Sequence, residues 1–105
     1  MRRIAGGIIL MALGVASAWA GAAEGKAVYE RACRSCHGAD GAGNANVAKM
    51  LKAEIPALSS AEVQAKSDAD LKAVVTQGKG KMKPVTSVTG NQVDDVVAYV
   101  RTLKK

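Results

Sequence analysis

The chain has 105 residues and a formal net charge of +6, and hydrophobic residues make up 49% of it. This length permits one domain with a small apolar core, not two. The basic excess does not indicate a nucleic-acid-binding protein, because aromatic residues form only 3% of the chain and do not alternate with the basic ones.

The N-terminus has the pattern of a secretory signal peptide. A positively charged start precedes an apolar stretch at residues 4–15, and small residues follow that stretch. Sites of the Ala-x-Ala type lead us to expect cleavage near Ala20 to Ala23. The predicted organisation is therefore a signal peptide at residues 1–22 and one domain at residues 23–105. An uncleaved anchor is the alternative, although the apolar stretch is short for a membrane span.

The most specific signal in the chain is the run CRSCH at residues 33–37, which ends a helix predicted from Glu24 to Cys33. A Cys-x-x-Cys-His run is the attachment site of a covalently bound c-type haem. Cys33 and Cys36 have the spacing that reaches the two vinyl groups of one haem as thioethers. The adjoining His37 is then placed to be an axial ligand of the iron. The predicted cofactor is one covalent haem c.

Three other kinds of site also use a Cys-x-x-Cys pair, namely a thioredoxin-like redox pair, half of a zinc site and a structural disulfide. None of them gives a reason for the histidine that follows. A zinc site would need a second ligand pair, and His37 is the only histidine in the chain. A redox pair is expected near a strand-helix-strand pattern, and the alternating apolar runs of such strands are absent from the sequence.

After this run, a glycine-rich loop at residues 38–44 leads into a pattern that is helical to the end of the chain. Three N-capping patterns, at residues 59–62, 67–70 and 89–92, predict the starts of three helices. Gly78 stands where the second of these is expected to end. The predicted fold class is therefore all-α. The last helix places a set of apolar residues on one face: Val93, Val96, Val97, Val100 and Leu103.

An iron held by four porphyrin nitrogens and His37 has a sixth position, for which two methionines are candidates. Met82 lies in a loop at residues 78–84 whose glycines allow close backbone approach and whose proline stiffens the chain. Met50 lies in a short helical segment at residues 47–51, where a methionine is more often packed in the core. We predict His37 and Met82 as the axial ligands. A lysine from the same loop, or an open site, is the alternative.

These residues resemble the class I family of small, bacterial, single-haem cytochromes c, over nearly the whole chain after the signal peptide. The resemblance implies a small fold of three to five helices wrapped around one covalently bound haem, with the N- and C-terminal helices crossing. Gly25 would allow their close approach, and Tyr29 and Tyr99 would pack at the crossing. The matching features are Gly25 and Tyr29, the run at residues 33–37, Met82 near Pro84, and Tyr99.

The resemblance also implies a support for the axial histidine. Pro56 resembles the family proline whose backbone carbonyl accepts a hydrogen bond from the histidine Nδ1, here that of His37, and so fixes the imidazole. Two features depart from the family. Lys83 stands between Met82 and Pro84, where many bacterial members have the proline directly after the methionine. The domain also lacks a tryptophan for a haem propionate, and possible substitutes are Gln64, Lys66 and Asn46.

Basic residues crowd around the loop that carries the predicted methionine ligand. The net charge falls from +6 to about +4 when the two arginines of the signal peptide leave. A positive rim at the haem edge would steer an acidic redox partner, and a solvated loop without a partner is the plain alternative. We expect redox proteins as partners, no nucleic acid, transient or no membrane contact, and a monomer. The crowded residues are Lys72, Lys79, Lys81 and Lys83.

The expected function is that of a periplasmic one-electron carrier. The chain is not expected to be an enzyme, because no carboxylate pair, second histidine or free nucleophile remains for acid-base or covalent catalysis. Two alternatives stay open. One is a five-coordinate haem protein for peroxide chemistry or small-gas binding, and the other is a fixed cytochrome subunit of a membrane redox complex.

Overall fold

The computed structural model describes residues 14–105, with side chains described from residue 21 onward. In this part of the chain there are only helices and loops, apart from one isolated bridge in the loop at residues 79–82, and the predicted all-α class is confirmed. The helices outnumber the predicted three to five because two of them are single turns of four residues. The six helices are α1 (Gly14–Ala32), α2 (Arg34–His37), α3 (Ala45–Leu51), α4 (Ala61–Gln64), α5 (Asp68–Gln77) and α6 (Asn91–Arg101).

Helix α1 is longer than the sequence pattern predicted. It was expected from Glu24, but the described helix already includes Gly14 and continues without a break to Ala32. The added segment is rich in alanine, the residue with the highest helix propensity. Its end also packs, since Ala22 is buried at 8% exposure. The predicted signal peptide at residues 1–22 falls largely outside the residues whose side chains are described.

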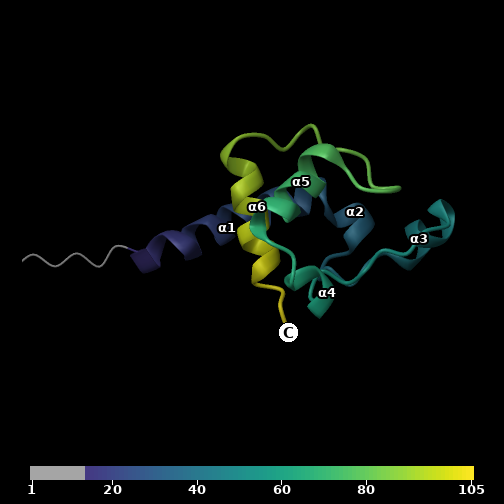
Figure 1. Cartoon of the computed structure of the whole chain (residues 1–105), viewed down its shortest axis with the longest axis horizontal. Coiled ribbons are helices and arrows are strands. Elements are labelled where there is room, and N and C mark those ends of the chain that lie inside the picture. Colours follow the sequence, from purple (N-terminus) through teal and green to yellow (C-terminus); the bar gives the residue numbers. More distant parts are fainter. Residues whose placement is uncertain (1–13) are drawn as a thin grey trace, which may run out of the picture.

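Helices α1 and α6 cross at the centre of the molecule, as Figure 1 shows. Gly25 lies at the crossing, where a Cβ atom would overlap the backbone carbonyl of Asp95 and come within 2.9 Å of the Tyr99 Cβ. Only a glycine fits so close an approach of two backbones. The role predicted for Gly25 is therefore confirmed.

The two tyrosines predicted at this crossing form a pair. The ring centroids of Tyr29 and Tyr99 are 5.2 Å apart, with an angle of 51° between the ring planes. This tilted arrangement is one that aromatic pairs favour. Tyr29 is fully buried, and its hydroxyl donates a hydrogen bond of 2.5 Å to the Gly38 carbonyl oxygen. The tyrosine thereby joins the helix crossing to the turn that follows α2.

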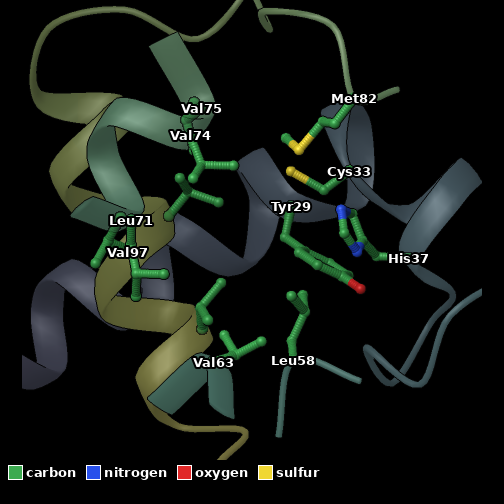
Figure 2. A pocket seen from close by; sticks show the side chains of 12 residues that line it. Tyr29, Cys33, His37, Leu58, Val63, Leu71, Val74, Val75, Met82 and Val97 are labelled. Carbon is green, nitrogen blue, oxygen red and sulfur yellow. The ribbon is translucent and has the colours of Figure 1, made fainter. Parts of the chain in front are cut away.

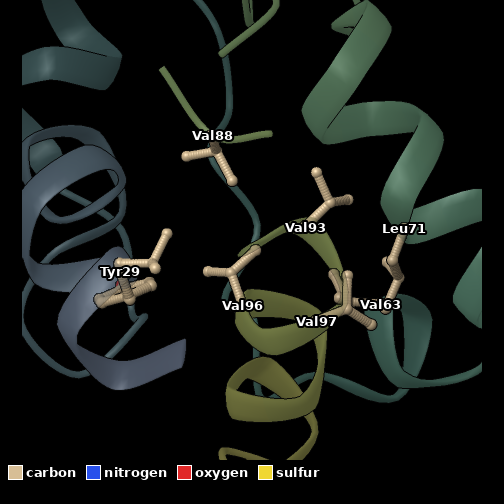
Figure 3. Close-up of a cluster of buried hydrophobic side chains, with 8 residues drawn as sticks. Tyr29, Val63, Leu71, Val88, Val93, Val96 and Val97 are labelled. Atoms are coloured by element: carbon tan, nitrogen blue, oxygen red, sulfur yellow. The ribbon is translucent and has the colours of Figure 1, made fainter. Parts of the chain in front are cut away.

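The core is small and is built mainly from valines. Helix α6 supplies its centre, and α1, α4 and α5 pack around it, as Figure 3 shows. Burial of a valine contributes about 1.5–3 kcal/mol, so a core of this size leaves the domain dependent on further apolar contacts. The buried cluster comprises Val28, Tyr29, Val63, Leu71, Val88, Val93, Val96 and Val97.

Two of the three predicted helix caps are formed in full. The Ser60 hydroxyl accepts a hydrogen bond from the Val63 amide at the start of α4, and the Ser67 hydroxyl accepts one from the Asp70 amide at the start of α5. Gly78, whose positive φ of 79° is one that glycine adopts readily, ends α5 as predicted.

The third cap is only half formed. The Gln92 side chain accepts a hydrogen bond from the Thr89 amide at 3.3 Å, which is one half of a capping box. The N-cap position of α6 belongs to Gly90, however, and no side chain caps the helix there. The threonine hydroxyl therefore does not play the part that the sequence pattern predicted.

Helix α3 lies apart from the other helices in Figure 1 and contains no buried residue. The Asn44 side chain caps it by accepting hydrogen bonds from the Asn46 and Val47 amides. Met50, which the sequence pattern assigned to core packing, is 72% exposed. That interpretation is wrong, because a short helix presents to a core only the face that other elements cover.

Candidate functional site

An apolar cavity lies between the helix crossing and the loop that follows α5. The space between its walls is about 490 Å³, and this figure includes the part that is open to solvent. Figure 2 shows side chains from α5 and α6 on one side of it, and Met82, Cys33 and His37 on the other. The lining residues are Tyr29, Cys33, His37, Leu58, Val63, Leu71, Val74, Val75, Met82, Val96, Val97 and Val100.

His37 is the only group in this lining that ordinarily titrates near neutral pH. Burial lowers its pKa, so the imidazole is neutral at pH 7 and keeps a lone pair for a metal. Its Nδ1 atom is buried and has no hydrogen-bond partner. A buried polar atom without a partner carries a cost that native proteins usually avoid. The predicted hydrogen bond from this atom to the Pro56 carbonyl is thus not formed in the structure, where Pro56 is an exposed residue beyond α3.

The two cysteines are free thiols three residues apart. Cys33 occupies the N-cap position of the single turn α2 without a side-chain capping hydrogen bond, and Cys36 lies within that turn. Burial raises the pKa of the Cys33 thiol, with a smaller opposing effect from Arg31, so the thiol is held in its neutral form. Cys33 lines the cavity, whereas Cys36 is half-buried and lies outside the lining. The structure therefore brings Cys33 together with His37 and places Cys36 one helical turn along.

The loop after α5 holds Met82 against the cavity. The Lys79 amide donates to the Met82 carbonyl and the Met82 amide donates to the Lys79 carbonyl, both at 2.9 Å. The Val85 amide then donates to the Val75 carbonyl at 2.8 Å and returns the chain to α5. Gly78 makes this path possible, because a side chain there would come within 2.5 Å of the Met82 carbonyl oxygen. Met82 lines the cavity even though Lys83 separates it from Pro84.

Three other residues that were candidates for haem binding do not have a free side chain at the cavity. Gln64, a predicted substitute for the missing tryptophan, donates both amide protons to backbone, to the Leu58 carbonyl at 2.8 Å and to the Val100 carbonyl at 3.0 Å. Its donors are therefore already used. Met50 and Asn46 lie on α3, outside the cavity.

The lysines near the loop are not equivalent. Lys72 forms an ion pair of 2.5 Å with Asp94, and this pair joins α5 to α6. The pair raises the pKa of Lys72, through its hydrogen bond first and its charge second. Lys79, Lys81 and Lys83 are exposed on the loop that carries Met82. These three are the exposed lysines of the predicted positive rim, whereas Lys72 is partly neutralised by its partner.

Sequence reasoning missed one prominent network. The Arg101 guanidinium contacts Asp68 and the carbonyls of Gln64 and Lys66, which tie the end of α6 to the segment around α4. These contacts join residues 33 to 37 positions apart, so no local pattern could have indicated them.

The lining fits a haem better than it fits an ion held by protein alone. Its walls are apolar, and its polar groups include a neutral imidazole, a neutral thiol and a thioether. Over the residues whose side chains are described, no group of three or more His, Cys, Asp or Glu side chains could hold a metal ion. The haem would therefore have to bring its own four nitrogen ligands.

An all-α domain that brings the first cysteine and the histidine of a Cys-x-x-Cys-His run, together with a loop methionine, to one apolar cavity has the design of a c-type cytochrome. Comparison with known families agrees. The chain belongs to the family described as cytochrome c oxidase, cbb3-type, subunit III, whose model matches residues 20–100. The cofactor is accordingly haem c, and the chemistry of the chain is haem-based electron transfer. The predicted resemblance to small c-type cytochromes is confirmed.

A solved structure is also similar. The c-type cytochrome KustC0563 superposes with a TM-score of 0.65 and is 30% identical in sequence. The match covers 77% of this chain and 98% of that one. No curated protein sequence matches the chain. None of the helices described is both long enough and apolar enough to cross a membrane.

Proposed function

We propose that the protein is a periplasmic one-electron carrier whose haem is attached to Cys33 and Cys36 and held axially by His37 and Met82. The observation that carries this proposal is the meeting of His37 and Met82, from distant parts of the chain, in the lining of one apolar cavity. Imidazole with thioether is an established axial pair in cytochromes c, and the thioether raises the reduction potential.

Bound haem supplies a metal centre that gains and loses a single electron. The residues of the chain hold that centre and set its surroundings. The neutral His37 imidazole offers a nitrogen ligand without first losing a proton. The unpaired Nδ1 of the same ring needs an acceptor, and the Pro56 carbonyl is the acceptor that we propose for the haem-bound protein. The valines and leucines of the lining give the centre apolar surroundings.

The proposal does not include an enzymatic role. Catalysis by peroxide activation or acid-base chemistry would need a second polar group over the open iron position. Apart from His37, Met82 and the Cys33 thiol that haem attachment would use, the lining offers only the Tyr29 hydroxyl, which is already bonded to the Gly38 carbonyl. With Met82 as the sixth ligand, the iron has no open position.

The exposed lysines of the loop, Lys79, Lys81 and Lys83, form the docking rim for an acidic redox partner. They lie in the same loop as Met82, which lines the cavity. Such a rim would raise the encounter rate with negatively charged partners and would weaken with added salt. We propose that the carrier is a monomer that meets its partners transiently.

One observation favours a second candidate. The matching family is described as subunit III of a cbb3-type oxidase, which raises the role of a fixed subunit in a membrane complex. The electron transfer would be the same. Purification from membranes under mild detergent separates the two, since a fixed subunit co-purifies with its complex and a diffusible carrier is recovered from the periplasmic fraction. The intact mass of the protein recovered in these fractions tests whether the signal peptide is cleaved near Ala20 to Ala23.

The ligation is tested by the optical spectra of the matured protein in both redox states. The carrier is expected to show a low-spin spectrum, a weak long-wavelength band from methionine bound to ferric iron, and no prompt reaction of the reduced form with carbon monoxide. A high-spin spectrum with prompt carbon monoxide binding would overturn the proposal in favour of the five-coordinate alternative.

A further inference from the structure

The guanidinium of Arg101 ties the C-terminal end of α6 to the chain around α4. Its Nε and Nη2 atoms both donate to Asp68 Oδ1, at 2.9 and 2.8 Å. Its Nη2 atom also donates to the Lys66 carbonyl at 2.6 Å, and its Nη1 atom donates to the Gln64 carbonyl at 3.0 Å. Hydrogen bonds from a charged donor are stronger than neutral ones, and the planar guanidinium fixes several acceptors at once.

Gln64 extends this network to the other side of the same segment. Its amide nitrogen donates to the Leu58 carbonyl at 2.8 Å and to the Val100 carbonyl at 3.0 Å. Its side-chain oxygen accepts from Arg101 at 3.4 Å. The backbone is therefore fixed to α6 just before α4 and just after it.

The segment held in this way forms one wall of the haem cavity. Leu58 and Val63 lie within it and Leu71 follows in the first turns of α5, and all three line the cavity. Helix α4 is a single turn, and Val63 is its only buried residue. So short a helix has little packing of its own, and the polar network supplies the attachment that packing would otherwise give.

We propose that Arg101 and Gln64 are positioning residues that hold the wall formed by Leu58 and Val63 against the haem and thereby set its reduction potential. This inference rests on the proposed function only in placing the haem in this cavity. The hydrophobic shell around a metal centre controls solvent access and therefore its potential. If the wall loosens, water reaches the haem and stabilises the more highly charged ferric state, so the potential falls.

The test is the reduction potential of the matured holoprotein in which Gln64→Met removes every polar contact of that side chain without changing the charge. The potential is expected to fall below that of the wild type. Arg101→Met is expected to lower the reduction potential as well. The double variant is expected to lower it by less than the sum of the two single shifts, because both residues hold the same segment.

Lys72→Met is the matched control. It also removes one positive charge and breaks an ion pair between α5 and α6, but the Lys72 ammonium is paired with Asp94 and acts on Asp68 of the Arg101 network only through its charge. The shift from Arg101→Met should exceed that from Lys72→Met. The inference is overturned if folded Gln64→Met holoprotein keeps the wild-type potential, even with a lower melting temperature, since the network would then be a structural attachment alone. Should Arg101→Met fail to fold, Gln64→Met still decides.

Failure of the ligation proposal can be told apart from failure of this inference. The first is read from the wild-type spectrum, through the absence of the methionine band. The second is read only from the differences in potential between the variants and the wild type.

Discussion

Gly25 of α1 lies directly against the backbone carbonyl of Asp95 of α6, with no room for a side chain between the two helices. The position sits in the middle of a helix, where glycine is otherwise unfavourable by about 1 kcal/mol relative to alanine. The close approach of the two backbones offsets that cost, because it lets the Tyr29 and Tyr99 rings meet.

Gly25→Ala is therefore expected to destabilise the protein by about 3 kcal/mol, at the upper end for overpacking, although helix propensity alone favours alanine. Denaturant unfolding of the holoprotein measures this. The control is Ala27→Gly on the exposed face of the same helix, which should cost about 1 kcal/mol through propensity only. An unchanged or raised stability of Gly25→Ala would mean that the helices do not cross here.

Burial raises the pKa of Tyr29 from 10.0 to about 12. A group whose pKa is raised on folding stabilises the fold below its unfolded-state pKa, and this contribution is lost as the pH rises. We expect stability to fall between pH 10 and about 12, by about 2 kcal/mol from this residue. Tyr29→Phe should lose the hydrogen bond to the Gly38 carbonyl at neutral pH but show a shallower fall over that range.

Unfolding free energies at several alkaline pH values measure the effect, with Tyr99→Phe as the matched control for the other ring of the pair. All other side chains are the same in the two proteins, so the difference between the wild type and Tyr29→Phe isolates the tyrosine. A slope in Tyr29→Phe as steep as that of the wild type would contradict the role assigned to burial.

Helix capping offers a comparison between two positions that look alike in the sequence. The Ser67 hydroxyl caps α5, so Ser67→Ala is expected to cost about 1 kcal/mol in thermal or denaturant unfolding. The Thr89 hydroxyl caps nothing, because Gly90 takes the N-cap position of α6, and Thr89→Ala is expected to be nearly neutral. Equal costs at the two positions would show that the capping box at residues 89–92 forms in full.

The positive rim predicts a charge-dependent rate of electron transfer with small inorganic reagents. Changing Lys79, Lys81 and Lys83 to glutamate should slow oxidation by anionic ferricyanide by about tenfold at low ionic strength and accelerate oxidation by a cationic cobalt phenanthroline complex. Stopped-flow measurements at two salt concentrations test this, because added salt should reduce both effects. Lys104→Glu at the exposed C-terminus is the control. Rates that move the same way with both reagents would contradict steering by charge.

Much of the fold was predictable because its signals are local or strongly periodic. The serine caps at Ser60 and Ser67, the glycine that ends α5, and the apolar face of α6 each depend on residues a few positions apart. The crossing of the terminal helices was predictable only through the resemblance to cytochromes c. No local pattern requires Gly25 to meet Asp95, which lies far along the chain.

What the sequence did not reveal depends on long-range contacts. Arg101 reads as an ordinary basic residue in a last helical turn, and only the folded chain shows that it contacts Asp68 and two backbone carbonyls. Met50 reads as a core residue because it lies in a short helical segment, where a methionine is more often packed, yet its side chain is exposed. In both cases the local pattern is correct about helix formation and uninformative about what the helix meets.

The two methionines also differ in what they contact, since Met82 lines the cavity and Met50 is exposed. Comparing them is therefore the most direct test of the site. The optical spectrum of the ferric protein should be recorded for the wild type, for Met82→Ala and for Met50→Ala. We predict that the long-wavelength methionine band is present in the wild type and in Met50→Ala and is absent from Met82→Ala alone. A band that survives in Met82→Ala, or that disappears in Met50→Ala, would contradict the assignment of His37 and Met82 as the axial pair.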